Sequence, residues 1–522
     1  MNLYVYRTFG HLNLFSGGHM NKCCRLRKSR DNWKQKAVDR AELIREMRKK
    51  INRMSSKIIS LEATLKKRIT GLSIENGNLQ AICKTRNDGN IICLQEAAFI
   101  RALCVILTTS AILSFRAVSR ILSLLSNLGV ISFNWTPHFT SIINWTLRAG
   151  MANLWNVTPC IDPWVAILDC SIGIGTRKAL VVLRVSLIAL QKKGGAIGLD
   201  DCECIGIEIA HSWNGSSVET SLNKIFEKAG KPLAILKDKG SDLKKGVVLW
   251  RQNQDAGEVW VIDDIGHETA NALKAEYAKT TAFKKFIEII HKGAGQLRQT
   301  SLAFVIPPKI RTKGRFQGIT KVAKWASETL KFIGGQGRAK TNSDIGQIRQ
   351  AFSGLTKLSP FLKKFISTCT IVSEFQKLLK NKGLNQATYR EGKQIIETLP
   401  KRSKVRKRLE NWLDRVLSIQ CRLGIGQTPL IVSSDVIESL FGKFKIIIQR
   451  NPMAELNRLI YVIPLLCGNH TLSDIERDIK QVSHYELQKT LQNEIPTTLR
   501  VARQQYRMGV PKSGNIPMLK TG

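Results

Sequence analysis

The spacing of hydrophobic positions changes along this chain, and each change predicts a different kind of element. Between residues 31 and 68, apolar side chains recur every three or four positions, which is the period of one helix face. This pattern predicts a long helix, either a dimerising coiled coil or an amphipathic helix packed on its own chain. The basic segment 1–30 and the Gly- and Asn-rich segment 70–94 are predicted to be a flexible N-terminus and a linker. The apolar positions of the helix are Leu43, Met47, Ile51, Met54, Ile58, Leu61 and Leu65.

Residues 95–155 keep a helical period and predict a helix-turn-helix domain. Ser114–Leu125 has the pattern of a first helix, and Gly129 suits the chain reversal after it. Thr136 and Pro137 suit the start of a second helix. An ordinary helical hairpin would have the same pattern. In a DNA-binding domain, the outward positions of the second helix would be free to meet phosphates or base edges. These positions are His138, Ser141, Asn144 and Arg148.

Residues 160–300 lose the helical period and contain short runs rich in β-branched residues. The order is three strands, a helix, a strand, a helix, a strand and a long helix, which is an α/β order. It is also the element order of the RNase H-like fold. The predicted strands are Val165–Asp169, Leu180–Ile188, Cys204–Ile209, Leu233–Leu236 and Val259–Ile262, and the predicted helices are Ser217–Lys228, Asp242–Trp250 and His267–Ile290.

After residue 300 the strand signal disappears, and residues 301–427 predict an all-helical insertion. Strand-like residues return at Pro429–Ser433, and a helix that carries Glu438 follows. The prediction is therefore an α/β protein with an RNase H-like mixed sheet. Residues 160–300 and 428–460 form its catalytic domain, and residues 461–522 a helical C-terminal region and tail.

The charge of the chain indicates its partner. Lys and Arg number 81 against 40 Asp and Glu, which gives a net charge of +41. Such an excess favours a polyanion, because contacts to phosphates release counterions. Double-stranded DNA is the expected partner, and a ribosome-associated or membrane-surface protein is the alternative. No signal-peptide pattern, zinc-type cysteine spacing or apolar run of membrane-spanning length is present, so we expect a cytoplasmic protein without membrane contact.

Three acidic residues give the clearest candidate chemistry: Asp169 ends the first strand, Asp238 follows the fourth, and Glu438 lies near the start of a late helix. In an RNase H-like sheet the first and fourth strands are neighbours, so Asp169 and Asp238 could converge. Carboxylates are the ligands that Mg²⁺ or Mn²⁺ requires, and two such ions can activate phosphodiester cleavage. Each acid also has a structural interpretation: a strand end, a turn residue, and a capping box formed by Asp435 and Glu438.

Further residues around this triad are candidates for auxiliary roles. Asp242 could assist or cap the next helix, Asp263 and Asp264 follow the fifth strand, and His267 could touch DNA or pack. Lys443 and Lys445 follow Glu438 and could bind a phosphate of DNA. The cations that flank Asp238 suit the same role or a solvated face, and they are Lys237, Lys239, Lys244 and Lys245.

Four segments carry a resemblance to DDE-type transposases of bacterial insertion sequences: Ala166–Asp169, Ile235–Leu243, Val261–His267 and Asp435–Lys445. The resemblance implies an RNase H-like catalytic domain in which Asp169, Asp238 and Glu438 bind two Mg²⁺ or Mn²⁺ ions. It also implies a nucleoid-associated homodimer or higher oligomer that hydrolyses a phosphodiester at element ends and transfers the 3′-hydroxyl into target DNA. A nuclease or resolvase without strand transfer and a non-catalytic basic DNA-binding protein are the alternatives.

Overall fold

The computed structural model divides the chain into two units, Met1–Leu94 and Gln95–Gly522. It describes residues 89–127, 135–172, 178–253, 258–310, 315–334, 343–448 and 458–495, isolated positions between 30 and 63, and residues 504, 506 and 507. The described positions between 30 and 63 are helical, but all seven apolar positions of the predicted coiled coil lie outside the described residues. No helix in the described part of the chain is long and apolar enough to cross a membrane.

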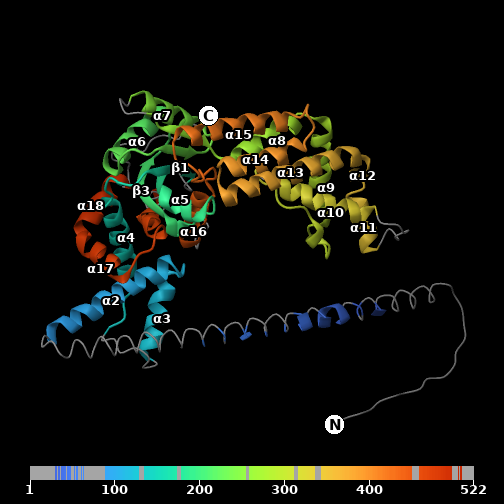
Figure 1. The fold of residues 1–522 in the computed structure, drawn as a ribbon. Helices are drawn as coiled ribbons and strands as arrows, with labels where there is room; N and C mark the ends of the chain where they lie inside the picture. The colour runs from blue at the N-terminus through green and yellow to red at the C-terminus, as the bar shows by residue number, and fades with distance from the viewer. Residues whose placement is uncertain are drawn as a thin grey trace, which may run out of the picture. The chain divides into compact units, whose positions relative to one another are not determined.

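The second unit is built around one five-stranded mixed sheet (Figure 1). The strand order is β3-β2-β1-β4-β5. Strand β2 is antiparallel to both of its neighbours, β1 and β3, whereas β4 and β5 run parallel to β1. The predicted adjacency of the first and fourth strands is therefore confirmed. The strands are β1 (Trp164–Ile172), β2 (Lys178–Ser186), β3 (Cys202–Ala210), β4 (Ala234–Lys237) and β5 (Trp260–Asp263).

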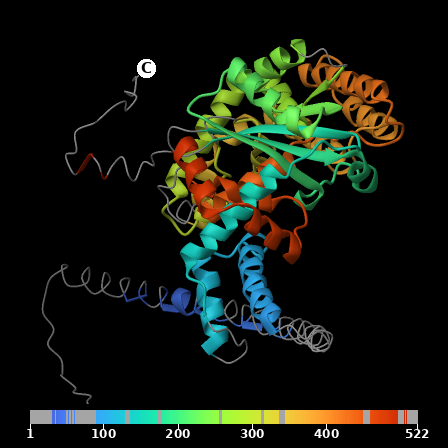
Figure 2. The ribbon, with the colours of Figure 1, turned by 90° about the vertical axis from the view of Figure 1, so that its left-hand side faces the viewer.

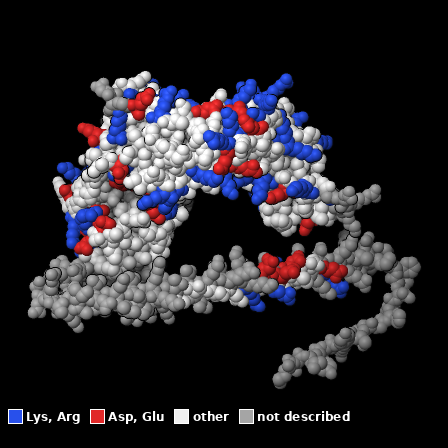
Figure 3. All heavy atoms as spheres, in the orientation of Figure 1, with Lys and Arg blue, Asp and Glu red and all other residues white. Residues whose placement is uncertain are grey.

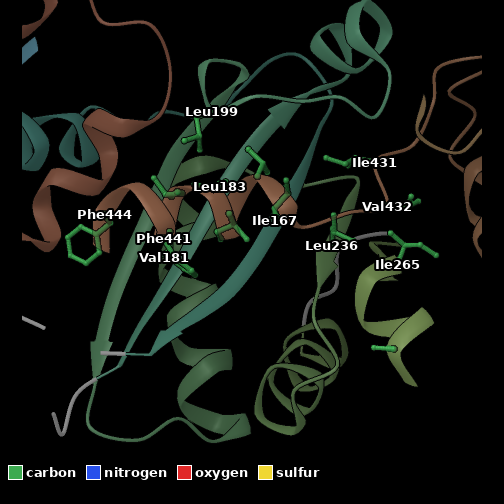
Figure 4. Close-up of a cluster of buried hydrophobic side chains, with 14 of the residues drawn as sticks. Ile167, Val181, Leu183, Leu199, Leu236, Ile265, Ile431, Val432, Phe441 and Phe444 are labelled. Atoms are coloured by element: carbon green, nitrogen blue, oxygen red, sulfur yellow. The ribbon is translucent and has the colours of Figure 1, made fainter. Parts of the chain in front are cut away.

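Both faces of the sheet are buried, because the side chains of each strand alternate between two hydrophobic clusters. Ala166 and Leu168 of β1 face the cluster that contains α6 (Gly215–Ala229) and α7 (Ser241–Gln252). Val165 and Ile167 face the other cluster, which contains α16 (Asp435–Ile448). Figure 4 shows Phe441 and Phe444 of α16 beside Ile167, Val181 and Leu183 of the sheet.

Helices from the two ends of the second unit pack on each other. α4 (Phe139–Trp155) contacts η3 (Arg458–Leu466), α17 (Leu472–Gln481) and α18 (His484–Glu494), as Figure 2 shows. The contact with η3 depends on Gly150, because a Cβ at this position would lie 1.6 Å from the carbonyl oxygen of Tyr461. The preceding helices are α2 (Gly89–Thr109) and α3 (Phe115–Asn127), and α5 (Leu187–Lys193) and η1 (Leu199–Asp201) connect β2 to β3.

A long helical segment separates β5 from α16. It packs as one body in which α13 contacts both α10 and α14, and α15 contacts α8. Its elements are α8 (Ile265–Tyr277), α9 (Thr281–Leu297), η2 (Ala303–Val305), α10 (Ile319–Ile333), α11 (Asp344–Ala351), α12 (Gly354–Lys357), α13 (Ser359–Lys382), α14 (Gln386–Glu397) and α15 (Lys404–Arg422).

Two predicted elements differ from the structure. The single helix expected at His267–Ile290 is two helices, because the Thr280 side chain accepts a hydrogen bond from the Phe283 N–H and starts α9. The strand expected at Pro429–Ser433 is an extended segment with one isolated bridge, between Leu430 and Leu384. This segment instead contacts the start of α8, where the Ile265 N–H donates to the Val432 carbonyl.

Candidate active site

Asp169 and Asp238 lie on neighbouring parallel strands. The β1–β4 pairing ends with Leu168 and Lys237, so each aspartate is the next residue after this pair. Asp169 does not end the first strand as predicted, because β1 continues to Ile172 and Asp169 pairs with Val181 of β2. Alternation along the strands puts Asp169 on the same face as Ile167, and Asp238 on the same face as Leu236. That face of the sheet is the one that α16 covers.

Glu438 lies at the fourth position of α16, which crosses this face. The helix begins at Asp435, and the Glu438 N–H donates to the Ser434 carbonyl. A capping box formed by Asp435 and Glu438 is therefore not present, because Asp435 is already inside the helix and its carboxylate binds Lys380. The Glu438 side chain is exposed, and no described residue donates a hydrogen bond to its carboxylate.

The charges of Asp238 and Glu438 act on Asp169. Burial and these two negative charges together raise the pKa of Asp169 to about 7. Nearby protein atoms desolvate the Glu438 carboxylate in part and raise its pKa, helped by the charges of Asp264 and Asp435, although the residue as a whole is exposed.

These residues fit a hard divalent cation in chemistry and in charge, since all three offer carboxylate oxygens. They do not form a closed ligand set, because no group of three or more His, Cys, Asp or Glu residues in the described part of the chain has metal-binding geometry. In the absence of a cation, Asp169, Asp238 and Glu438 are therefore not arranged as a complete set of metal ligands.

Asp263 does not face this cluster as a free carboxylate. It is the centre of an ion-pair network with Lys237 Nζ at 3.0 Å, Arg415 Nη2 at 3.1 Å and Lys239 Nζ at 3.6 Å. Burial alone would raise the pKa of Asp263, but Lys237, Lys239 and Arg415 hold it below its usual value. The side chain is therefore occupied by cations of its own chain.

Asp264 is buried and starts α8. Its carboxylate accepts hydrogen bonds from the His267 N–H at 2.8 Å and from the Ser434 N–H at 2.8 Å. His267 Nδ1 lies 3.0 Å from the same carboxylate, and His267 Nε2 lies 2.7 Å from Gln317 Nε2. Both ring nitrogens therefore have partners within the protein, and the imidazole also interacts electrostatically with Asp169, Asp238 and Glu438. The hydrogen bond to Asp264 raises the pKa of His267.

Three other predicted residues lie around the cluster. Asp242 is exposed in the first turn of α7 and does not cap that helix, because the N-cap residue is Gly240. Lys445 is exposed on α16, two turns after Glu438 and on the same helix face. Lys443 is half-buried and follows Glu438 by five residues, so it lies on a different face of the helix.

The residues predicted to read DNA are only partly free to do so. Arg148 donates to the carbonyls of Val482 and Ile479 at 2.5 and 2.6 Å, and Asn144 Nδ2 lies 2.5 Å from His484 Nδ1. The expectation that these two side chains point into open solvent is wrong, because the C-terminal helices cover that face of α4. His138 is the N-cap residue of α4, and Ser141 is half-buried one turn later.

The sequence interpretation missed the role of Lys237. Its position next to Asp238 suggested a contact to a DNA phosphate, but the side chain is only 2% exposed and faces Asp263. Lys237 is the last residue of β4, and all four residues of this strand are buried. Lys239, Lys244 and Lys245 lie after the strand. The link from Asp264 to Ser434 joins residues that are 170 positions apart and leaves no local pattern.

Comparisons with known proteins give little further guidance. No protein-family model matches the chain, and no curated protein matches it. Among solved structures, the chain is similar to the Drosophila P element transposase strand transfer complex. The TM-score is 0.38 at 11% sequence identity, with 75% of this chain and 98% of that chain covered. This similarity is too low to transfer a fold or an activity.

Proposed function

We propose that this protein is a DNA transposase with an RNase H-like catalytic domain of the DDE type. In this proposal it cleaves a phosphodiester at the ends of a DNA element and joins the 3′-hydroxyl to target DNA. Two observations support the proposal. Asp169 and Asp238 are carried by neighbouring parallel strands, and the negative charges of Asp238 and Glu438 both help to raise the pKa of Asp169.

The charge of the surrounding chain supports a nucleic-acid substrate. The whole chain carries +41, and Lys and Arg are spread over the face drawn in Figure 3. A cluster of unpaired carboxylates within so basic a protein needs a cation to approach a phosphate, because the carboxylates alone would repel it. Mg²⁺ or Mn²⁺ would bind the carboxylate oxygens and offset their repulsion of a phosphate. Two such ions are the number expected for phosphoryl transfer.

Each residue has a distinct part in this proposal. Asp169, whose pKa responds to the charges of both other acids, would hold the cations together with Asp238 and Glu438. Lys445, exposed on the face of α16 that carries Glu438, would contact the DNA backbone. When bound, the cations supply activation of the attacking oxygen and stabilisation of the leaving oxygen.

A cut-and-join assay tests the proposal. Labelled DNA that carries the sequences flanking this reading frame is incubated with protein and Mg²⁺, and nicked and joined products are separated. Wild type should give both products. Asp169→Asn, Asp238→Asn and Glu438→Gln should each lower cleavage by at least about 100-fold, since even indirect partners of metal ligands contribute 10- to 100-fold.

The matched control is Glu203→Gln on β3, at the opposite edge of the same sheet, where the carboxylate pairs with Arg184. This variant should cleave as wild type does. DNA binding without metal-dependent breakage by wild type would refute an enzyme, and nicking without joining would identify a nuclease. Cleavage that survives all three substitutions of the acids would refute the site.

A further inference from the structure

The turn after β5 contains two adjacent aspartates whose side chains engage different parts of the candidate site. Asp263 forms an ion pair with Lys237, the residue before Asp238, whereas Asp264 accepts a hydrogen bond from the main chain that leads into α16. The two carboxylates belong to consecutive residues at the end of β5. One peptide bond joins these residues, so their Cα atoms stay about 3.8 Å apart.

On the first side, Lys237 connects Asp263 to Asp238. The Lys237 ammonium lies 3.0 Å from Asp263 Oδ1 and 3.1 Å from the carbonyl oxygen of Asp238. The lysine is 2% exposed, so its charge depends on this pairing. Asp238 itself is held in a turn, because its carboxylate accepts the Gly240 N–H at 2.9 Å. Movement of Asp263 would therefore shift the main chain that carries Asp238.

On the second side, Asp264 connects the same turn to Glu438. Its Oδ1 accepts the N–H of Ser434, and the carbonyl of Ser434 in turn accepts the N–H of Glu438. The neighbouring Ile265 N–H donates to the Val432 carbonyl, which fixes the same segment a second time. The first turn of α16 is thus attached to the residue that follows Asp263.

The helical segment inserted before α16 reaches this turn through α15. Arg415 lies 3.1 Å from Asp263 Oδ2, and Trp412 Nε1 donates to the Asp263 carbonyl at 3.2 Å. One helical repeat of seven residues earlier, Arg408 pairs with the buried Glu268 of α8 at 2.8 Å. The position of α15 and the position of the turn are therefore coupled.

We infer that Asp263 and Asp264 form a brace that sets the separation between Asp238 and Glu438. They are positioning residues, and they do not themselves bind the metal ions. The inference rests on the proposed function in one respect, namely that Asp238 and Glu438 act together on cations. It adds that the geometry of this pair is imposed by the turn after β5, and through Arg415 and Trp412 by α15.

Hydrogen–deuterium exchange of the full-length protein without metal or DNA tests the brace directly. Asp264→Asn should accelerate exchange about tenfold or more in peptides covering 432–440. Asp263→Asn should accelerate exchange in peptides covering 236–244. Glu203→Gln, which breaks an ion pair at the opposite edge of the sheet, should change neither region. Unchanged exchange in both regions for both brace variants would overturn the inference.

The affinity for a metal ion distinguishes a positioning role from a purely structural role, because a purely structural role would leave this affinity unchanged. In calorimetric titrations with MnCl₂, both brace variants should bind Mn²⁺ about tenfold more weakly than wild type, while their affinity for DNA stays the same. Faster exchange combined with wild-type Mn²⁺ affinity would show that the turn is structural only and would overturn the inference. Asp264→Glu, which keeps the charge, should recover part of the affinity lost in Asp264→Asn.

The two proposals fail in different ways. A wild-type protein that binds no Mn²⁺ refutes the metal site, and the exchange comparison then still decides whether the brace holds the two segments. If a brace variant does not fold, Lys237→Met replaces it, since this change removes the ammonium between Asp263 and the Asp238 carbonyl with little loss of volume. It should accelerate exchange in 236–244 and leave 432–440 unchanged.

Discussion

At the scale of single residues, the ionised form of a carboxylate in the candidate site is destabilised by its surroundings. Asp169 is the clearest case, because burial and two neighbouring carboxylates raise its pKa to about 7 from an ordinary value of 3.8. The folded protein therefore holds a proton at Asp169 that the unfolded chain would release. Stability falls as the pH rises from about 4 through 7, because in this range the folded state binds more protons than the unfolded state.

Asp169→Asn should consequently stabilise the metal-free protein, and more at pH 8 than at pH 5. The expected gain at pH 8 is at most about 4 kcal/mol, since the pKa rises from 3.8 to about 7 and one pKa unit corresponds to about 1.4 kcal/mol. Thermal unfolding in the presence of a chelator measures it as a higher Tm. Saturating Mg²⁺ should reverse the order of the two proteins, because only wild type keeps its full ligand set. An equal difference at both pH values would contradict the assignment of the raised pKa.

At the scale of elements, close backbone packing joins α4 to η3. Gly150→Ala should destabilise the protein by about 2–3 kcal/mol or more, because the new methyl group would overlap the Tyr461 carbonyl. Gly295→Ala in α9 is the matched control, since a Cβ there meets no atom within 4 Å. It should raise stability by about 0.5–1 kcal/mol through helix propensity. Calorimetry should give a Tm below that of wild type for Gly150→Ala and above it for Gly295→Ala. A wild-type Tm for Gly150→Ala would refute the close contact between α4 and η3.

Elements with a strong local period were predictable from sequence, and tertiary pairings were not. The runs of β-branched residues predicted the five strands of the sheet. The order of elements predicted that the strands carrying Asp169 and preceding Asp238 are neighbours. The extended segment around Leu430 has the composition of a strand, but the sheet already ends at β5 and pairs it only once. The occupation of Arg148 by Val482 and Ile479 depends on contacts more than 300 residues away, which no local pattern encodes.

At the scale of the whole molecule, charge dominates the expected behaviour. With a net charge of +41, binding to DNA should weaken steeply with salt, because each phosphate contact releases counterions. We expect the affinity to fall by about 10³-fold or more between 50 and 200 mM salt. Fluorescence anisotropy with a labelled duplex measures the slope, and Asp169→Asn should share it. A slope near zero would argue against phosphate contacts as the basis of binding.

The packing of α4 on η3 also has a consequence for how the protein is made. α4 ends at Trp155 and η3 begins at Arg458, so a ribosome adds about 300 residues between them. At roughly 5–20 residues per second this takes about 15–60 s. During that time the surface of α4 that packs on η3 lacks this partner, although α3 and β3 are already available to it. The nascent chain therefore passes through a long interval in which this hydrophobic surface is exposed, and Glu438 can approach Asp169 only after the helical segment between β5 and α16 has been made.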